Sequence, residues 1–223
     1  MESSPLATMV LFRLGPIGIT RPVVTTWAIM AALTLTAWLV TRRLSQSPDR
    51  RQAAIEGIVS GVAAQIAEVI RGDARDLLPL VGTLFIFLVA ANLSGVLPGV
   101  EAPTAKLETP AALAVIVFFS VHYFGIRARG LRRYLAGFAK PKLIMLPLNV
   151  LSEITRTFSL MVRLFGNVMS GEFVIALVLA LAGLFVPIPL MVLELLVGLV
   201  QAYIFTVLAT VFIGAAVGGR EGG

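Results

Sequence analysis

The sequence predicts an all-α membrane protein with about five membrane-embedded helices and one amphipathic surface helix. Hydrophobic residues make up 58% of the 223 residues and charged residues only 13%, whereas a soluble domain carries about 25% charged residues. Several apolar runs approach the roughly 20 residues that a helix needs to cross a bilayer. The chain has no cysteine and one histidine, which excludes disulfide scaffolds, thiol catalysis and poly-histidine metal sites.

The first predicted span covers residues 23–41, an apolar run flanked by arginines. A secretory signal peptide is the alternative, but the run starts late, is long and lacks a small-x-small cleavage site. Residues 50–71 follow Ser47-Pro48-Asp49, a helix-start pattern, and carry apolar side chains at helical spacing among charged ones. They are predicted to form an amphipathic helix that lies on the membrane surface or against other helices.

Two further spans are predicted at residues 77–97 and 111–126, where the chain is apolar again. Pro98-Gly99 ends the first of them, and a polar loop separates the two. The second is followed by residues 127–142, a basic segment without any acid.

Orientation follows from the basic segments, because loops rich in Lys and Arg stay on the cytoplasmic side. Residues 42–51 and 127–142 together hold ten Lys or Arg. We therefore expect both in the cytoplasm, the N-terminus outside and the C-terminus in the cytoplasm.

The last third of the chain is nearly all apolar, and Pro187-Ile-Pro189 divides it into predicted helices at residues 146–185 and 190–217. The first would be about 60 Å long at 1.5 Å per residue, which exceeds a perpendicular crossing of about 30 Å. Either this helix is strongly tilted or its first third lies along the membrane surface. The two helices are predicted to form a long, strongly tilted hairpin, as a curved neighbouring surface would favour. With no linker or repeat, residues 1–223 are predicted to form a single integral membrane domain.

Charged residues are rare in this apolar region: residues 157–219 contain only Arg163, Glu172 and Glu194. A charge in the hydrocarbon region costs a few to over ten kcal/mol unless it faces water or a partner. The three residues therefore form either a structural ion pair or part of an ion path.

Helical spacing separates the arginine from the acids. Ser159, Arg163 and Asn167 are four residues apart and share one face. Glu172 is nine residues beyond Arg163, about 180° round an ideal helix. Arg163 is therefore expected to project toward something outside this chain.

The two acids can meet between the helices of the hairpin, with Gln201 seven residues after Glu194 on the same face. Carboxylates can change protonation, and desolvation moves their pKa toward the working range. Arginine stays charged, so Arg163 can attract a carboxylate and block proton leakage. Glu172 and Glu194 are thus a plausible proton relay.

The run from Ser159 through Arg163 and Asn167 to Glu172, SLMVRLFGNVMSGE, resembles the signature of the a subunits of F-type ATP synthases. The helix from Glu194 through Gln201, the Asn92-Leu-Ser-Gly-Val-Leu-Pro end of the second span and the Pro103-Thr-Ala loop are also similar to that family.

The resemblance implies a stator subunit beside a rotating ring of c subunits, whose carboxylates receive ions through two half-channels. Arg163 would face those carboxylates and separate the half-channels. Asn167, Glu172, Glu194 and Gln201 would line the outer half-channel, and Ser159 would lie near the inner one. The chain departs from the family in having Glu at both acid positions, where many members have one histidine.

The resemblance also implies peripheral stalk subunits of the b type and the lipid bilayer as partners, in a bacterial plasma (inner) membrane. No cofactor, metal, nucleic acid or small-molecule substrate other than the coupling ion is expected. The chain has no Gly-x4-Gly-Lys-Ser/Thr loop, so it is not expected to hydrolyse nucleotide itself.

The residues leave three alternative functions open. The coupling ion could be sodium instead of the proton. A self-contained secondary transporter would need a substrate cavity and usually internal repeats, and no repeat is found. An intramembrane hydrolase would need a nucleophile with a base, and Ser120 and His122 are only two residues apart on opposite sides of a helix.

Overall fold

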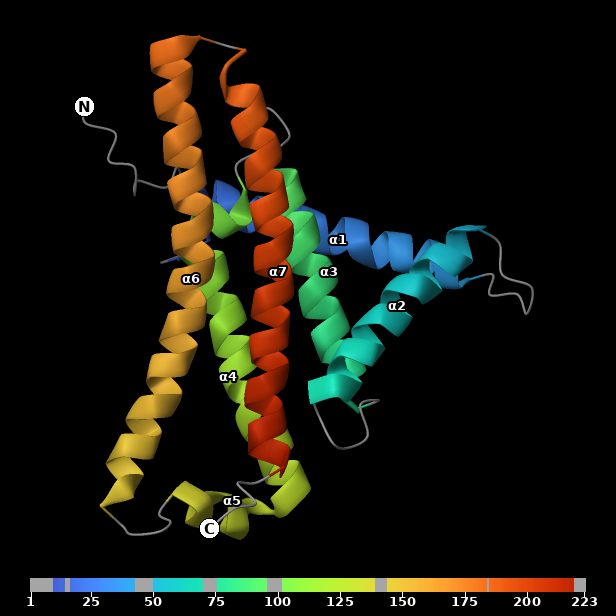
Figure 1. The fold of residues 1–223 in the computed structure, drawn as a ribbon, viewed down its shortest axis with the longest axis vertical. Coiled ribbons are helices and arrows are strands. Elements are labelled where there is room, and N and C mark those ends of the chain that lie inside the picture. The colour runs from blue at the N-terminus through green and yellow to red at the C-terminus, as the bar shows by residue number, and fades with distance from the viewer. Residues whose placement is uncertain are drawn as a thin grey trace.

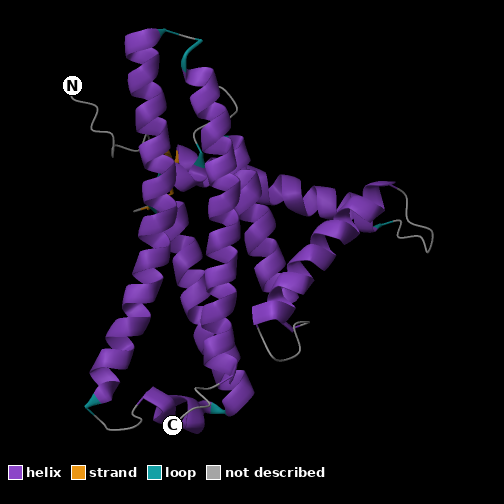
Figure 2. Cartoon of the chain, in the orientation of Figure 1, coloured by secondary structure: helices purple, strands orange, loops and turns teal. Residues whose placement is uncertain are grey.

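The computed structural model describes residues 10–14, 17–42, 50–69, 76–95, 102–138, 144–183 and 185–218. A short antiparallel hairpin of two strands precedes a set of helices (Figures 1 and 2). The elements are β1 (Val10–Leu14), β2 (Ile17–Thr20), α1 (Arg21–Thr41), α2 (Arg50–Val69), α3 (Leu78–Ser94), the short 3-10 helix η2 (Pro103–Ala105), α4 (Glu108–Arg129), α5 (Leu131–Phe138), α6 (Met145–Ala182) and α7 (Pro187–Gly218). The predicted all-α fold class is confirmed.

Within the described residues, four helices are long and apolar enough to cross a membrane, namely α1, α4, α6 and α7. The apolar α3 has 17 residues, about 26 Å at 1.5 Å per residue. Large apolar side chains such as Trp27, Phe119 and Leu181 stay exposed, as expected of a surface that faces lipid. The chain is an integral membrane protein, while its division into five crossings of one domain stays a prediction.

The central helix of the bundle is α7, which contacts α2, α3, α4 and α6 (Figure 1). Its side chains Ala202, Phe205, Ala209 and Ile213 are fully buried and recur at helical spacing. Two of the four are alanines, and small residues let helix backbones approach closely. The core therefore forms around one side of α7.

In contrast, α6 lies at the edge of the bundle and runs antiparallel to α7 (Figure 1). Its buried side chains are Leu160, Leu164 and Val168, spaced by four residues. This narrow stripe packs inward and leaves most of the helix surface uncovered by the rest of the chain.

The turn between the two long helices differs from the prediction. Gly183, with φ of 80°, follows the end of α6, a conformation that glycine adopts without steric cost. The helix α7 begins at Pro187 and not at residue 190, because proline fits the first turn of a helix, where its missing N–H needs no partner. Both prolines thus belong to the start of α7.

The amphipathic helix α2 packs against α3 and α7. Ile66 is fully buried, and the hydroxyl of Tyr203 on α7 donates a hydrogen bond to Gln65 Oε1 at 2.8 Å. Of the two placements considered from the sequence, the structure therefore shows α2 against other helices.

A second difference is α5, a helix inside the basic segment for which no helix is predicted. Several predicted features lie outside the described residues: the helix start at Ser47-Pro48-Asp49, the helix end at Pro98-Gly99, Lys140, Lys142 and the C-terminal residue.

Candidate functional site

Arg163 lies on the exposed side of α6, one position before the buried Leu164. Ser159 is exposed one turn earlier, and Asn167 is half-buried one turn later. Within the described part of the chain, no carboxylate forms an ion pair with Arg163. The arginine therefore projects away from the bundle, as its spacing indicates.

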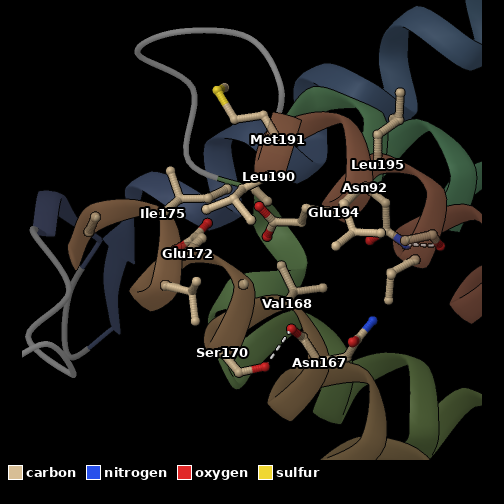
Figure 3. A pocket seen from close by; sticks show the side chains of 18 of the residues that line it. Asn92, Asn167, Val168, Ser170, Glu172, Ile175, Leu190, Met191, Glu194 and Leu195 are labelled. Atoms are coloured by element: carbon tan, nitrogen blue, oxygen red, sulfur yellow. Dashed lines mark hydrogen bonds between the residues drawn. The ribbon is translucent and has the colours of Figure 1, made fainter. Parts of the chain in front are cut away.

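A cavity of about 460 Å³ lies between α6 and α7, and its lining is mostly apolar. Its polar lining side chains are Asn92, Asn167, Ser170, Glu172 and Glu194. Figure 3 shows both carboxylates turned toward this space from the two helices. The hairpin thus brings together the two acids that are 22 residues apart in the sequence.

The half-buried Glu194 reaches across to the backbone of α6. A Cβ atom on Gly171 would stand 2.7 Å from Cδ and 3.1 Å from Cγ of Glu194. The distance to Cδ is too short for a real Cβ contact, and the distance to Cγ is tight. The absence of a side chain at Gly171 therefore makes room for this acid. Gly171 stands directly before Glu172 in the sequence, where a glycine is expected to let two helices approach closely.

Asn167 connects the arginine to the cavity. It shares a helix face with Arg163 and also lines the cavity beside Glu172 and Glu194. Asn167 and Arg163 are four residues apart, about 6 Å along the helix. The end of the cavity is therefore about one helical turn from the arginine.

Gln201 lies apart from the other predicted residues. Its side chain is buried on α7 and is not among those that line the cavity. Among the described residues its Nε2 atom has no hydrogen-bond partner, and an unsatisfied buried donor costs about 1–3 kcal/mol. Such a group is suited to bind a water molecule or a partner atom that approaches this part of α7.

Asn92 forms the cavity wall on the side of α3. Its Nδ2 donates to the carbonyl of Gly198 at 2.7 Å, and its Oδ1 accepts from Thr104 Oγ1 at 2.9 Å. One amide thereby joins α3, α7 and η2. Thr104 is fully buried, and its part in this network could not be seen in the sequence.

Near the other end of α6, Glu153 pairs with Arg156 at 3.8 Å, as i,i+3 spacing on a helix allows.

His122 Nδ1 lies 2.8 Å from the carbonyl of Phe118. Ser120 Oγ donates to the carbonyl of Ile116 at 2.7 Å and so bonds to its own helix. This arrangement disfavours the hydrolase alternative.

The fold and this site define an integral membrane protein that places ionisable side chains between and along its two longest helices. The sequence model of the family described as ATP synthase A chain matches residues 23–214. The chain therefore belongs to the ATP synthase A chain family, and the resemblance drawn from its motifs is confirmed.

Relatives match nearly the whole chain. ATP synthase subunit a 2 of Bradyrhizobium sp. (strain BTAi1) is 78% identical over 218 residues, 98% of each chain. ATP synthase subunit a 2 of Pelobacter propionicus is 50% identical over 96% of this chain and 94% of its own. ATP synthase subunit a 1 of Hahella chejuensis is 46% identical over 95% and 90%.

Proposed function

We propose that this chain is the stator ion channel of a rotary F-type ATP synthase in a bacterial plasma membrane. It conducts protons between the two sides of the membrane and the carboxylates of a rotating c ring, and b-type stalk subunits hold it in place. The N-terminus lies outside and the C-terminus in the cytoplasm. The family assignment supports the membrane sector of an ATP synthase as its location.

The observation that carries this proposal is the cavity with two acids that ends about one helical turn from an exposed arginine. Glu172 and Glu194 supply groups that can accept and release a proton in an apolar wall. Asn167 continues the polar lining toward Arg163. In this proposal the cavity is the outer half-channel, and Ser159 marks the approach to the inner one.

The exposed side of α6 supports a ring as the neighbour of Arg163. Leu151, Ile154, Phe158 and Val162 are large apolar side chains exposed on the turns before and beside it. In lipid alone, an arginine at this place would be costly. A ring with an apolar surface and an embedded carboxylate satisfies both features, and the charged pair separates the two half-channels.

On α7, the described residues leave the Nε2 atom of the buried Gln201 without a hydrogen-bond partner. We place it on the outer path near the ring, where water or a ring carboxylate completes its hydrogen bonds. This assignment accounts for a buried donor that the described part of the chain leaves unsatisfied.

The coupling ion is tested with the intact complex in vesicles. A pH gradient with a membrane potential should drive ATP synthesis in sodium-free medium. If synthesis instead requires a sodium gradient, sodium is the coupling ion. Purification of the complex should also recover a small two-helix membrane protein in many copies, and its absence would favour a self-contained transporter.

The acid pair is tested by a double-mutant cycle. Glu172→Gln and Glu194→Gln should each slow proton flux more than they reduce the amount of assembled complex. If the pair relays one proton, the double variant should be little slower than the slower single variant. Multiplication of the two defects would show independent roles, and wild-type flux in Glu172→Gln would remove that residue from the path.

A further inference from the structure

The helix α5 leaves part of its apolar face uncovered. Leu131 and Leu135 are four residues apart and therefore share one face, yet they are 55% and 56% exposed. Tyr134, on the adjacent edge of the helix, is only 6% exposed. The Tyr134 side of α5 therefore packs against the rest of the chain, and the side with Leu131 and Leu135 stays exposed.

Contacts of Tyr134 with α4 fix the position of α5. The ring of Tyr134 occupies the space that a side chain at Gly125 on α4 would fill. It also meets the His122 ring edge to face, with centroids 5.8 Å apart. Burial raises the pKa of Tyr134, and the nearby Glu153 carboxylate raises it further against an opposing effect of Arg129. The phenol therefore stays neutral in this contact.

Two exposed arginines follow the first leucine of α5. Arg132 and Arg133 have no carboxylate within ion-pair distance among the described residues. By comparison, Arg127 pairs with Asp76 at 3.7 Å, and Arg129 donates to carbonyls at the end of α7. Positive charge that no described carboxylate neutralises thus stands beside exposed leucines.

We propose that α5 is an interfacial helix that binds anionic phospholipid. Leu131 and Leu135 enter the acyl-chain region, and Arg132 and Arg133 bind the headgroups. An amphipathic helix with basic residues binds an anionic bilayer surface in this way. The helix lies where α4 ends and α6 begins (Figure 1), so it is held at the level where membrane-crossing helices leave the hydrocarbon core.

Lipid fits this surface better than an acidic protein partner. The exposed leucines need an apolar medium. So does the start of α6, because its N-cap Ile144 and Leu148 in its first turn are 76% and 64% exposed. A bilayer supplies an apolar layer directly below a charged one, which matches both the exposed apolar side chains and the exposed arginines.

Bromolipid quenching tests this proposal on the intact complex in vesicles. The only tryptophans of the chain are Trp27 and Trp38, so Trp27→Phe and Trp38→Phe with Leu135→Trp place the chain's only tryptophan on α5. Brominated phosphatidylglycerol and brominated phosphatidylcholine are compared as quenchers. The effect of substituting both Arg132→Gln and Arg133→Gln is compared with the effect of Arg42→Gln, at the residue directly after α1.

Each arginine near an anionic surface strengthens binding about fivefold, so the two arginines together should make phosphatidylglycerol preferred roughly 25-fold at low salt. The preference should fall as salt rises, vanish in the double Gln variant and persist in Arg42→Gln. Equal quenching by both lipids, or a preference unchanged in the double variant, would overturn the proposal. Quenching by neither lipid would also overturn it, because protein or water would then cover this face. If the tryptophan variant does not assemble, mass spectrometry of lipids retained by the otherwise unaltered complex gives the same comparison.

Discussion

Gly171 and Glu194 face each other across the gap between α6 and α7. The Glu194 carboxylate occupies the space that a side chain at position 171 would fill. The position of the acid in the cavity is therefore set by an absent side chain on the opposite helix. A proton path is sensitive to such a placement, because transfer needs donor and acceptor within hydrogen-bond reach.

We expect Gly171→Ala to slow proton flux while the complex still assembles. The new Cβ would displace the flexible end of Glu194 without moving the backbone. Gly82→Ala on α3 is the matched control, because a Cβ there has nothing within 4 Å. Both substitutions gain about 1 kcal/mol of helix propensity, so the difference in flux isolates the contact with Glu194. Equal flux in the two variants would show that the position of this acid does not limit transport.

Among the elements, η2 is joined to the bundle by one buried amide. Thr104 donates to Asn92, and Asn92 donates to the backbone of Gly198. Gly198 permits this approach, since a Cβ there would stand 3.1 Å from Cβ of Asn92. The wall of the cavity on the side of α3 thus depends on a connection between three elements.

Thr104→Val should destabilise this connection by about 1 kcal/mol or more, because it leaves Asn92 Oδ1 buried without its donor. Thr104→Ser keeps the hydroxyl and should stay closer to the wild type. The measurement is the temperature at which the purified complex releases this subunit. The role of the network would be contradicted if Val and Ser lowered that temperature equally.

The apolar runs predict the long helices well, since their length and composition decide that they cross a membrane. Which helix stands at the centre could not be predicted, because α6 and α7 are apolar on every side and no polar face marks the exterior. The cavity also depends on the register between two helices, to which Gly171 contributes. The acids and Arg163 could be singled out because charge is rare in this region. Thr104 stands in the Pro103-Thr-Ala motif, but nothing in the sequence indicates its hydrogen bond to Asn92.

At the scale of the whole molecule, the ends of the described chain are held by polar contacts. Thr20 Oγ1 donates to Glu108 Oε2 at 2.7 Å, which ties the start of α1 to the start of α4. Arg129 donates to the carbonyls of Ala215 and Val217 at the end of α7. Glu108 and Arg129 stand at opposite ends of α4. The distribution of Lys and Arg predicts that the end with Arg129 is cytoplasmic.

Single-cysteine labelling tests this orientation, since the chain has no native cysteine. Leu107→Cys should react from outside only, and Arg133→Cys from the cytoplasmic side only, because both positions are exposed. Thr104 is unsuitable as a labelling site because it is fully buried. Reaction of Leu107→Cys only from the cytoplasmic side would reverse the proposed topology.

The central claim is that Arg163 faces the ring and separates the two half-channels. The most direct measurement is ATP synthesis by vesicles that contain the Arg163→Ala complex under an imposed ion gradient, with subunit content as the measure of assembly. Synthesis should fall to background with assembly intact, while Arg42→Ala should synthesise normally. Arg163→Lys keeps the charge without the planar fork of guanidinium and should not restore the full rate. Normal synthesis by the assembled Arg163→Ala complex would contradict the claim.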